Sequence, residues 1–205
     1  MQPNRQGLTV ADAAAARHAI RSYTDAPIPD DDLQSILATV GLAPSAWNLQ
    51  PWRIVVVRDP ELKQQLMTAA PGQKQVGAAP LVFVFYTDMH DVLNTLDEII
   101  HPSADDDRRA ATKRSIRRYF DERSPAEATQ WGVAQTFIAV GYLLLAAQSL
   151  GYATSPMQSF QGEAVKRLLG LAPSAAVAAL VAMGVANETA RPHHRHHLSR
   201  FATIR

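Results

Sequence analysis

Residues 44–52 read PSAWNLQPW and form a loop expected between a helix and a strand. The loop holds two prolines, two tryptophans and the hydrogen-bonding side chains of Ser45, Asn48 and Gln50. Loops that are rich in such side chains and stiffened by proline commonly position a ligand or a reacting group. The alternative is a helix stop at Pro44, followed by tryptophans that pack in the core. On its own, the stretch leaves both interpretations open.

A second unusual cluster lies closer to the N-terminus, where residues 17–21 read RHAIR. The alanine-rich residues 10–20 predict a helix. Arg17 and Arg21 stand four positions apart and would project from the same face of that helix. Such a pair can bind one phosphate through charge-assisted hydrogen bonds. A solvated basic face is the alternative, because surface arginines are common.

The rest of the chain alternates between helical and strand-like patterns. Helices are expected from Asp30 to a stop at Pro44 and over residues 60–70, 88–100, 108–122, 125–150 and 163–169, with strands over 53–58, 81–86 and 177–185. The strands lie far apart in sequence without regular βαβ alternation. This favours an α+β fold over a doubly wound sheet.

The clearest helix start is Ser124-Pro125-Ala126-Glu127, a capping box with proline at the first helical position. The helix that it opens ends at Gly151 and is apolar on nearly every side, which predicts a long central helix enclosed by other elements. We expect a single domain over residues 1–205, in which the polar residues 186–205 form an extended C-terminal arm.

Composition narrows the possible functions. The 205 residues carry 20 Lys+Arg, 19 Asp+Glu and no Cys. The formal charge of +1 gives no argument for a nucleic-acid partner. Because cysteine is absent, any redox chemistry has to come from a bound cofactor. The sequence has two long apolar stretches, residues 133–147 and 171–186, and neither reaches the roughly 20 apolar residues of a membrane span. The N-terminus lacks the pattern of a secretory signal. We expect a cytoplasmic protein without a membrane partner.

Several strong motifs are missing from the sequence. It contains no dinucleotide-binding GxGxxG after a strand, no P-loop, no GxSxG and no HExxH. The tract His193-His194-Arg195-His196-His197 is broken by an arginine. Because metal ligands must converge in a fixed geometry, we expect no metal site there.

Taken together, RHAIRSY at residues 17–23 and PSAWNLQPW at residues 44–52 resemble the nitroreductase family of FMN-dependent oxidoreductases. The family pattern is R-[RH]-[SA]-x-[RK]-x-[FY], followed further along by P-S-x-x-N-x-Q-P-W. The resemblance continues through RIVVVRDPEL, residues 75–86, the helix at 131–152, SPMQSF at 155–160 and an arginine near the C-terminus. It implies a nitroreductase-like fold, with a central mixed or antiparallel sheet around a long helix, and an intertwined homodimer that binds FMN at its interface.

The resemblance also implies which residues bind FMN. Arg17 and Arg21 would hold the phosphate and ribityl side, and His18 would add backbone and edge contacts. Arg195, with His193, would complete the phosphate site from the arm. Ala19 belongs to the same site, but the family often has a serine there, so that one phosphate-binding hydroxyl is absent.

The isoalloxazine ring and the ribityl chain would be lined by a further set of residues: Pro44, Ser45, Asn48, Gln75, Pro156, Met157, Gln158 and Ser159. Residues 156–159 are expected as a strand-to-helix loop across the flavin. Tyr119 or Phe120 would form an aromatic lid over the open ring face, on the substrate side. Many family members have Glu-Gly where this chain has Gln158-Ser159, which removes a negative charge near the flavin.

The implied activity is hydride transfer from NADH or NADPH, through flavin N5, to a small nitroaromatic or quinone acceptor in a ping-pong cycle. No side chain is expected to act as a catalytic acid or base.

Two alternatives stay open. One is another flavin activity on the same fold, such as dehalogenation, flavin fragmentation or aldehyde reduction. An insertion or lid over the flavin, expected within residues 87–123, would distinguish these activities. The other is a non-enzymatic protein that binds flavin or nucleic acid through the basic residues of 108–118. Acidic residues precede and interrupt that basic run, which argues against nucleic acid.

Overall fold

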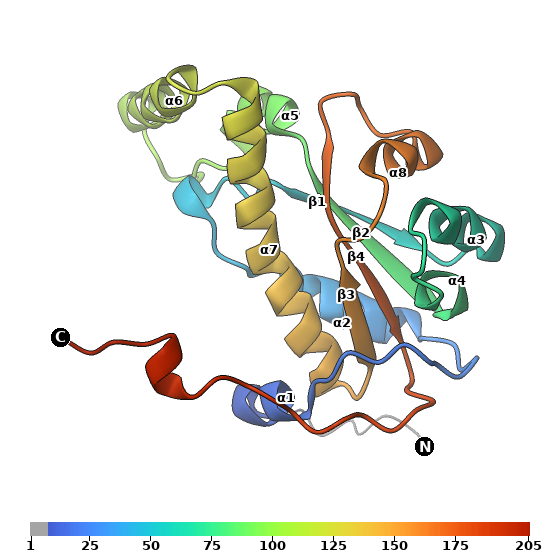
Figure 1. The fold of residues 1–205 in the computed structure, drawn as a ribbon. Coiled ribbons are helices and arrows are strands. Elements are labelled where there is room, and N and C mark those ends of the chain that lie inside the picture. Colours follow the sequence, from blue (N-terminus) through green and yellow to red (C-terminus); the bar gives the residue numbers. More distant parts are fainter. Residues whose placement is uncertain (1–7) are drawn as a thin grey trace.

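The computed structural model describes residues 8–205 and contains a four-stranded antiparallel sheet with helices on both faces (Figure 1). The strand order is β1 (Trp52–Val57), β2 (Leu81–Thr87), β4 (Ala176–Gly184) and β3 (Ala153–Met157). Every neighbouring pair is antiparallel, with Val84 of β2 opposite Val55 of β1 on one side and Leu180 of β4 on the other. The predicted α+β class is confirmed.

Eight helices and three 3-10 turns surround the sheet within the described residues. They are α1 (Val10–Ala16), α2 (Asp30–Gly41), η1 (Ala46–Asn48), α3 (Pro60–Ala69), α4 (Gln75–Ala78), α5 (Met89–Asn94), η2 (Leu96–Glu98), α6 (Asp106–Asp121), α7 (Pro125–Ser149), α8 (Gly162–Leu169) and η3 (Leu198–Arg200).

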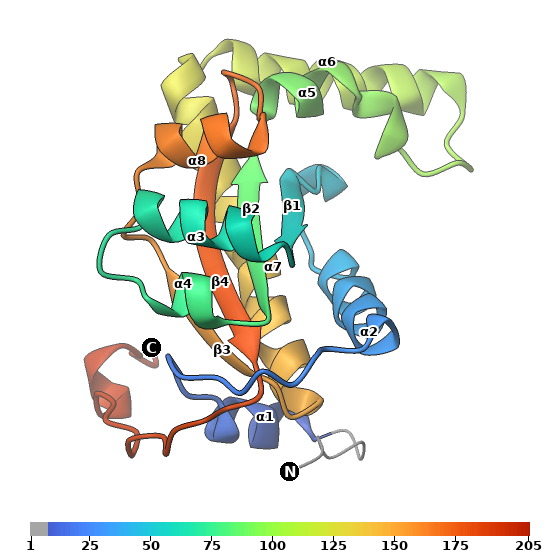
Figure 2. The same ribbon diagram turned by 90° about the vertical axis from the view of Figure 1, so that its right-hand side faces the viewer.

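The alternating side chains of β2 divide the core into two layers. Leu81, Phe83 and Phe85 point into a cluster formed with α2 and α7, where Ile36 and Leu143 are fully buried. Val82 and Val84 belong to the cluster on the other face, which is covered by α3, α4 and α8 (Figure 2). Because both faces are covered, the central strands consist almost entirely of apolar residues.

Helix α7 crosses one face of the sheet and starts as predicted. Ser124 accepts a hydrogen bond from the Glu127 backbone, and the Glu127 carboxylate accepts one from the Ser124 backbone, so the capping box is formed. By length and composition alone α7 could cross a membrane, but here it packs on β2 and β4. The expectation that other elements enclose α7 is wrong for the single chain, because its apolar residues Phe137 and Ile138 are 36% and 37% exposed.

The helix expected over residues 10–20 is shorter than predicted. α1 ends at Ala16, and from Arg17 the backbone is extended. Residues 17–23 instead pair with other segments, since Ala19 forms a parallel bridge to Thr154 and Tyr23 an antiparallel bridge to Ala186. These long-range partners replace the local helical hydrogen bonds, and Arg17 and Arg21 therefore do not share a helical face.

Three further boundaries differ from the sequence-based expectation. Residues 153–157 form β3, so Pro156 and Met157 lie in a strand rather than in the expected loop. The helix expected over 88–100 is divided into α5 and η2 at Thr95, whose hydroxyl donates to the Asp91 carbonyl oxygen at 3.0 Å. The helix expected from Asp30 to a stop at Pro44 begins at Asp30 but ends at Gly41 as α2, and Pro29 occupies its N-cap position without a side-chain bond.

Residues 186–205 leave the sheet as an extended arm, which runs antiparallel to residues 17–24 at its start (Figure 1). The Thr24 amide donates to the Val185 carbonyl oxygen and the Asn187 amide to the Ser22 carbonyl oxygen, both at 2.9 Å. From residue 191 onward, every residue of the arm is exposed. The arm therefore joins the body of the chain mainly at its beginning.

We predict that Gly132→Ala lowers the free energy of unfolding by about 1–2 kcal/mol. A Cβ at this position would lie 2.6 Å from Thr87 Oγ1 and 2.8 Å from Met89 Sδ, where α7 meets the end of β2. Overpacking of this kind costs about 1–3 kcal/mol, more than the roughly 1 kcal/mol gained by replacing glycine in a helix.

Gly162→Ala is the matched control for chemical denaturation, because a Cβ at the start of α8 would meet no atom within 4 Å. It should leave stability unchanged or raise it slightly. Equal destabilisation by the two substitutions would contradict the close approach of α7 to the sheet.

Candidate functional site

The extended residues 17–21 and the first part of the arm enclose a pocket of about 500 Å³, here called the basic pocket. It is lined on one side by Arg17, His18, Ala19, Ile20 and Arg21, and on the other by Glu188, Thr189, Ala190, Arg191, Pro192, His193 and Arg195. Two segments far apart in sequence therefore bring four arginines together. The predicted convergence of Arg17, His18, Ala19 and Arg21 with His193 and Arg195 is present in the structure.

The positive charges of the basic pocket are not neutralised by ion pairs. Across residues 8–205, the ion pairs formed by arginine and lysine involve none of its four arginines. Burial lowers the pKa of the Arg17 guanidinium, and the nearby Arg195 charge lowers it further. Both causes disfavour the charged form, so the pocket is suited to an anionic ligand that would compensate them.

His18 and His193 stack at the edge of this pocket, with ring centroids 3.9 Å apart and planes inclined by 17°. His18 Nδ1 lies 2.9 Å from the Ala16 carbonyl oxygen, and His193 Nε2 lies 2.9 Å from the Ala15 carbonyl oxygen. Each ring therefore donates one hydrogen to the end of α1, which orients it and joins the arm to the N-terminal segment.

Glu188 and Arg191 are pocket residues that the sequence analysis missed. Glu188 Oε1 accepts hydrogen bonds from the amides of Arg21, at 2.5 Å, and Ser22, at 3.3 Å. The same carboxylate, after the larger effect of burial, raises the pKa of the Tyr23 hydroxyl. Arg191 stands four positions before Arg195 in an extended arm, so a period of two along the arm was the available signal.

One wall of the basic pocket, residues 17–21, lies against β3. The Ile20 amide donates to the Thr154 carbonyl oxygen at 3.2 Å, which places residues 17–21 along that strand. At the end of β3, Met157 Sδ lies 3.9 Å from Nε2 of the buried Gln75. Gln158 and Ser159 follow as exposed residues. Gln75 and Met157, predicted separately, are thus in contact.

The 44–52 loop has an unusual backbone. Trp47, Asn48 and Gln50 have φ values of 53°, 57° and 43°, in the left-handed region that residues other than glycine seldom adopt. Each such residue costs about 1–3 kcal/mol and persists only where its surroundings enforce it. Two bonds do so: the Gln50 amide donates to Ser45 Oγ at 2.8 Å, and the Ala46 amide donates to Gln135 Oε1 on α7 at 3.0 Å. This supports the interpretation of the loop as a site.

Within one chain, however, the 44–52 loop does not reach the basic pocket. Trp47 packs near Trp131 in the first part of α7, whereas α1 packs near Tyr142 in its second part. Eleven residues of helix separate these two positions, or about 17 Å along the axis. Pro44, Ser45 and Asn48 are therefore not brought together with Arg17 and Arg21.

Tyr119 and Phe120 lie beside this loop. The Tyr119 ring meets Trp47 edge-on with a centroid separation of 4.8 Å, and Phe120 meets Trp131 edge-on at 5.1 Å. Phe120 is buried, while Tyr119 is half-buried and carries the Arg123 guanidinium over its ring. The predicted lid residues thus accompany the 44–52 loop rather than the basic pocket, and their role as a lid stays a prediction.

The histidine tract at 193–197 does not form a cluster of metal ligands. In the described part of the chain, no three His, Cys, Asp or Glu side chains gather as such ligands would. Within the tract, the His193 ring stacks on His18. His197 Nδ1 accepts a hydrogen bond from the Ser199 amide at 3.4 Å and so caps η3.

Comparisons with known proteins identify the family and the fold of the chain. A family model described as "Nitroreductase family" matches residues 14–185. A Thermus thermophilus protein named NADH dehydrogenase is 46% identical over 188 residues, covering 92% of each chain. An FMN reductase [NAD(P)H] of Bacillus subtilis is 29% identical over 144 residues, covering 70% of this chain and 51% of its own.

The fold also has solved counterparts. A nitroreductase-type protein from Exiguobacterium sibiricum, solved in complex with FMN, superposes with a TM-score of 0.85 and 23% identity, over 98% of this chain and 100% of that one. This likeness confirms the nitroreductase-like fold, and the match of the family model over most of the chain shows membership of the family. On the sequence and the fold together, the chain belongs to the nitroreductase family.

Proposed function

We propose that this protein is an FMN-dependent oxidoreductase that uses NADH or NADPH to reduce a small-molecule acceptor. The observation that carries the proposal is the basic pocket, in which Arg17, Arg21, Arg191 and Arg195 converge without ion-pair partners among the described residues. The names of the Thermus thermophilus and Bacillus subtilis relatives support the same chemistry.

The residues present fit a flavin phosphate. A phosphate dianion requires several charge-assisted donors, and the four arginines supply planar guanidinium groups suited to it. The Glu188 carboxylate already accepts from two successive backbone amides at this pocket, which marks those amides as donors to an anion. Gln75, buried beside Met157, can both donate to and accept from a ring edge that carries carbonyl and N–H groups.

FMN held in the basic pocket would supply the hydride-transfer chemistry that couples NADH or NADPH to a nitroaromatic or quinone acceptor in a ping-pong cycle. The chain's own residues bind and orient: the basic pocket fixes the phosphate, residues 156–159 and Gln75 border the ring, and the aromatic residues beside the 44–52 loop exclude water. No acidic or basic side chain is assigned to proton transfer. We expect this reaction in the cytoplasm.

The second part of the proposal is that the site is completed by a homodimer. In one chain Pro44, Ser45 and Asn48 do not line the basic pocket, but a second copy could bring its loop there. Phe137 and Ile138 provide an exposed apolar surface on α7 of the kind that a partner covers. A twofold arrangement of α7 helices would place two complete sites at the interface.

The function is tested first by the visible absorption of the purified protein. Oxidised flavin bands that bleach on anaerobic addition of NADH or NADPH are the expected result, and return of the bands on addition of a quinone would establish turnover. A protein that stays colourless after incubation with FMN would contradict the proposal.

We predict that Arg21→Ala raises the Kd for FMN about tenfold or more, because it removes a charge-assisted contact to the phosphate. Stability should change by less than about 0.5 kcal/mol, since Arg21 is exposed and its backbone bond to Glu188 is retained. Fluorescence titration with FMN and thermal unfolding measure the two quantities.

Arg114→Ala is the matched control for this prediction, because Arg114 is an exposed arginine on α6 outside the basic pocket. Unchanged flavin affinity in Arg21→Ala, or an equal loss in both variants, would refute the assignment of the phosphate site.

We predict that the double substitution Phe137→Asp with Ile138→Asp converts the protein to a monomer and abolishes FMN retention. Two carboxylates on the exposed face of α7 would be buried without partners in a dimer, which costs several kcal/mol. Size-exclusion chromatography with light scattering measures the mass, and absorbance measures the flavin content. Gln65→Asp, on the exposed surface of α3 across the sheet, is the control. A monomeric variant that keeps its flavin would show that one chain suffices.

A further inference from the structure

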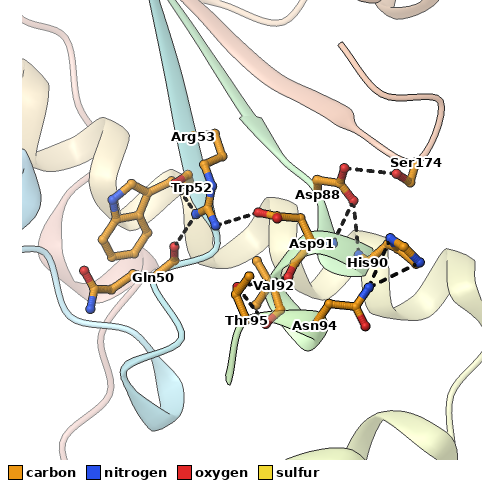
Figure 3. A network of polar contacts seen from close by, with 10 residues as sticks. All are labelled: Gln50, Trp52, Arg53, Asp88, His90, Asp91, Val92, Asn94, Thr95 and Ser174. Carbon is orange, nitrogen blue, oxygen red and sulfur yellow. Dashed lines mark hydrogen bonds and ion pairs between the residues drawn. The ribbon is translucent and has the colours of Figure 1, made fainter. Parts of the chain in front are cut away.

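The left-handed residues of the 44–52 loop need contacts that hold them, and the bonds to Gln135 and Ser45 reach only as far along the loop as the Gln50 amide. Its second half, from Gln50 to the start of β1, is held by Arg53. Arg53 Nη1 donates to the Gln50 carbonyl oxygen at 3.2 Å and to the Trp52 carbonyl oxygen at 3.1 Å (Figure 3). One guanidinium therefore fixes both residues that flank Pro51.

Arg53 is itself held from the other side. Its Nη2 forms an ion pair with Asp91 Oδ2 at 2.8 Å, in a setting where the two side chains are 35% and 47% exposed. The planar guanidinium thus bridges two carbonyl oxygens of the loop and one carboxylate, a combination that the single ammonium of a lysine reproduces only in part. The ion pair aims the guanidinium at the loop.

Asp91 has a fixed position because the start of α5 is fixed. Asp88 Oδ1 accepts from the amides of His90 and Asp91 at 3.1 and 3.3 Å, and Asp88 Oδ2 accepts from Ser174 Oγ at 3.0 Å (Figure 3). Ser174 lies in the loop before β4. The chain of contacts therefore runs from the 44–52 loop, through Arg53 and Asp91, to the ends of two central strands.

We propose that Arg53 is a positioning residue for flavin binding and that Asp91 orients it. Arg53 holds Gln50, the last of the three left-handed residues, and through it keeps the loop in the conformation that presents Asn48 to the cofactor, without touching the cofactor itself. This inference rests on the proposed function, because it takes the 44–52 loop as part of an FMN site. It adds the Arg53–Asp91 ion pair to the two bonds from Ser45 and Gln135 that maintain the strained loop.

The same strand provides a matched control. Arg58, directly after the other end of β1, pairs with Asp30 on α2 through Nη1 and Oδ1 at 2.5 Å. This pair involves the same residue types, follows the same strand and contacts no part of the 44–52 loop. A general loss of stability from breaking an arginine–aspartate pair next to β1 should be equal for the two sites.

The test compares Arg53→Met, Asp91→Asn, Arg53→Lys and Arg58→Met in the full-length protein. Arg53→Met should raise the Kd for FMN about tenfold and weaken the visible circular dichroism of bound flavin, which reports the asymmetry of the ring's surroundings. Asp91→Asn should change both in the same direction by a smaller factor, and Arg53→Lys should restore part of the affinity. Arg58→Met should leave the Kd and the dichroism unchanged, with a similar shift in Tm.

An Arg53→Met protein that binds FMN within about twofold of wild type would overturn the proposal. Equal loss of affinity in Arg53→Met and Arg58→Met would do the same, since the effect would then be one of general stability. Should Arg53→Met fail to fold, Asp91→Asn and Arg53→Lys decide by the same two readouts. A wild-type chain that takes up no FMN refutes the proposed function itself and is recognised before any variant is made.

Discussion

The pairing of β2 with β4 is the interaction on which the rest of the structure depends. Both strands are buried on both faces, so each side of the sheet has to be covered by a helical layer. This requirement places α2 and α7 on one face and α3, α4 and α8 on the other. It also leaves β1 and β3 as the outer strands of the sheet. The functional segments join the molecule at these two edges.

The consequence is a site divided between opposite edges. The 44–52 loop leads into β1, whereas residues 17–21 run along β3, and three strand spacings of about 4.8 Å separate these outer strands. On the proposed function, a second chain would bring its 44–52 loop to the basic pocket of the first. The exposed apolar residues Phe137 and Ile138 of α7, the helix that crosses the sheet, would then form the surface through which two copies meet. The topology of the sheet thus supports the proposed dimer independently of the family resemblance.

Local signals in the sequence predicted local structure well. The capping box at Ser124, the helix expected from residue 60 and the β-branched strand before it depend on neighbouring residues, and they stand as expected. The failures involve distant partners. Residues 17–23 are extended because β3 and the arm supply their hydrogen bonds, and β3 itself contains Pro156 and lacks an obvious strand pattern. Arg17 and Arg21 still reach one pocket, since positions four apart share a side of an extended chain as well as of a helix. Arg191 shares the alternation of Arg195 along the extended arm, whereas Glu188 required the path of the arm, which no local pattern gives.

The basic pocket and the strained loop share one physical property. Each raises the free energy of the folded chain unless other contacts compensate it. Four arginines line one pocket, where burial lowers the pKa of Arg17 and the Arg195 charge lowers it further. Three left-handed residues in one loop store backbone strain. An anion bound in the pocket would compensate the charges of the arginines. A ring bound against the loop would contact the residues that the strained backbone presents. Any ligand that binds only the folded chain stabilises it by mass action. If that ligand also needs two chains, its binding energy favours the dimer as well. On the proposed function, cofactor binding, dimer formation and stability are therefore linked, and a change in one should be measurable in the other two.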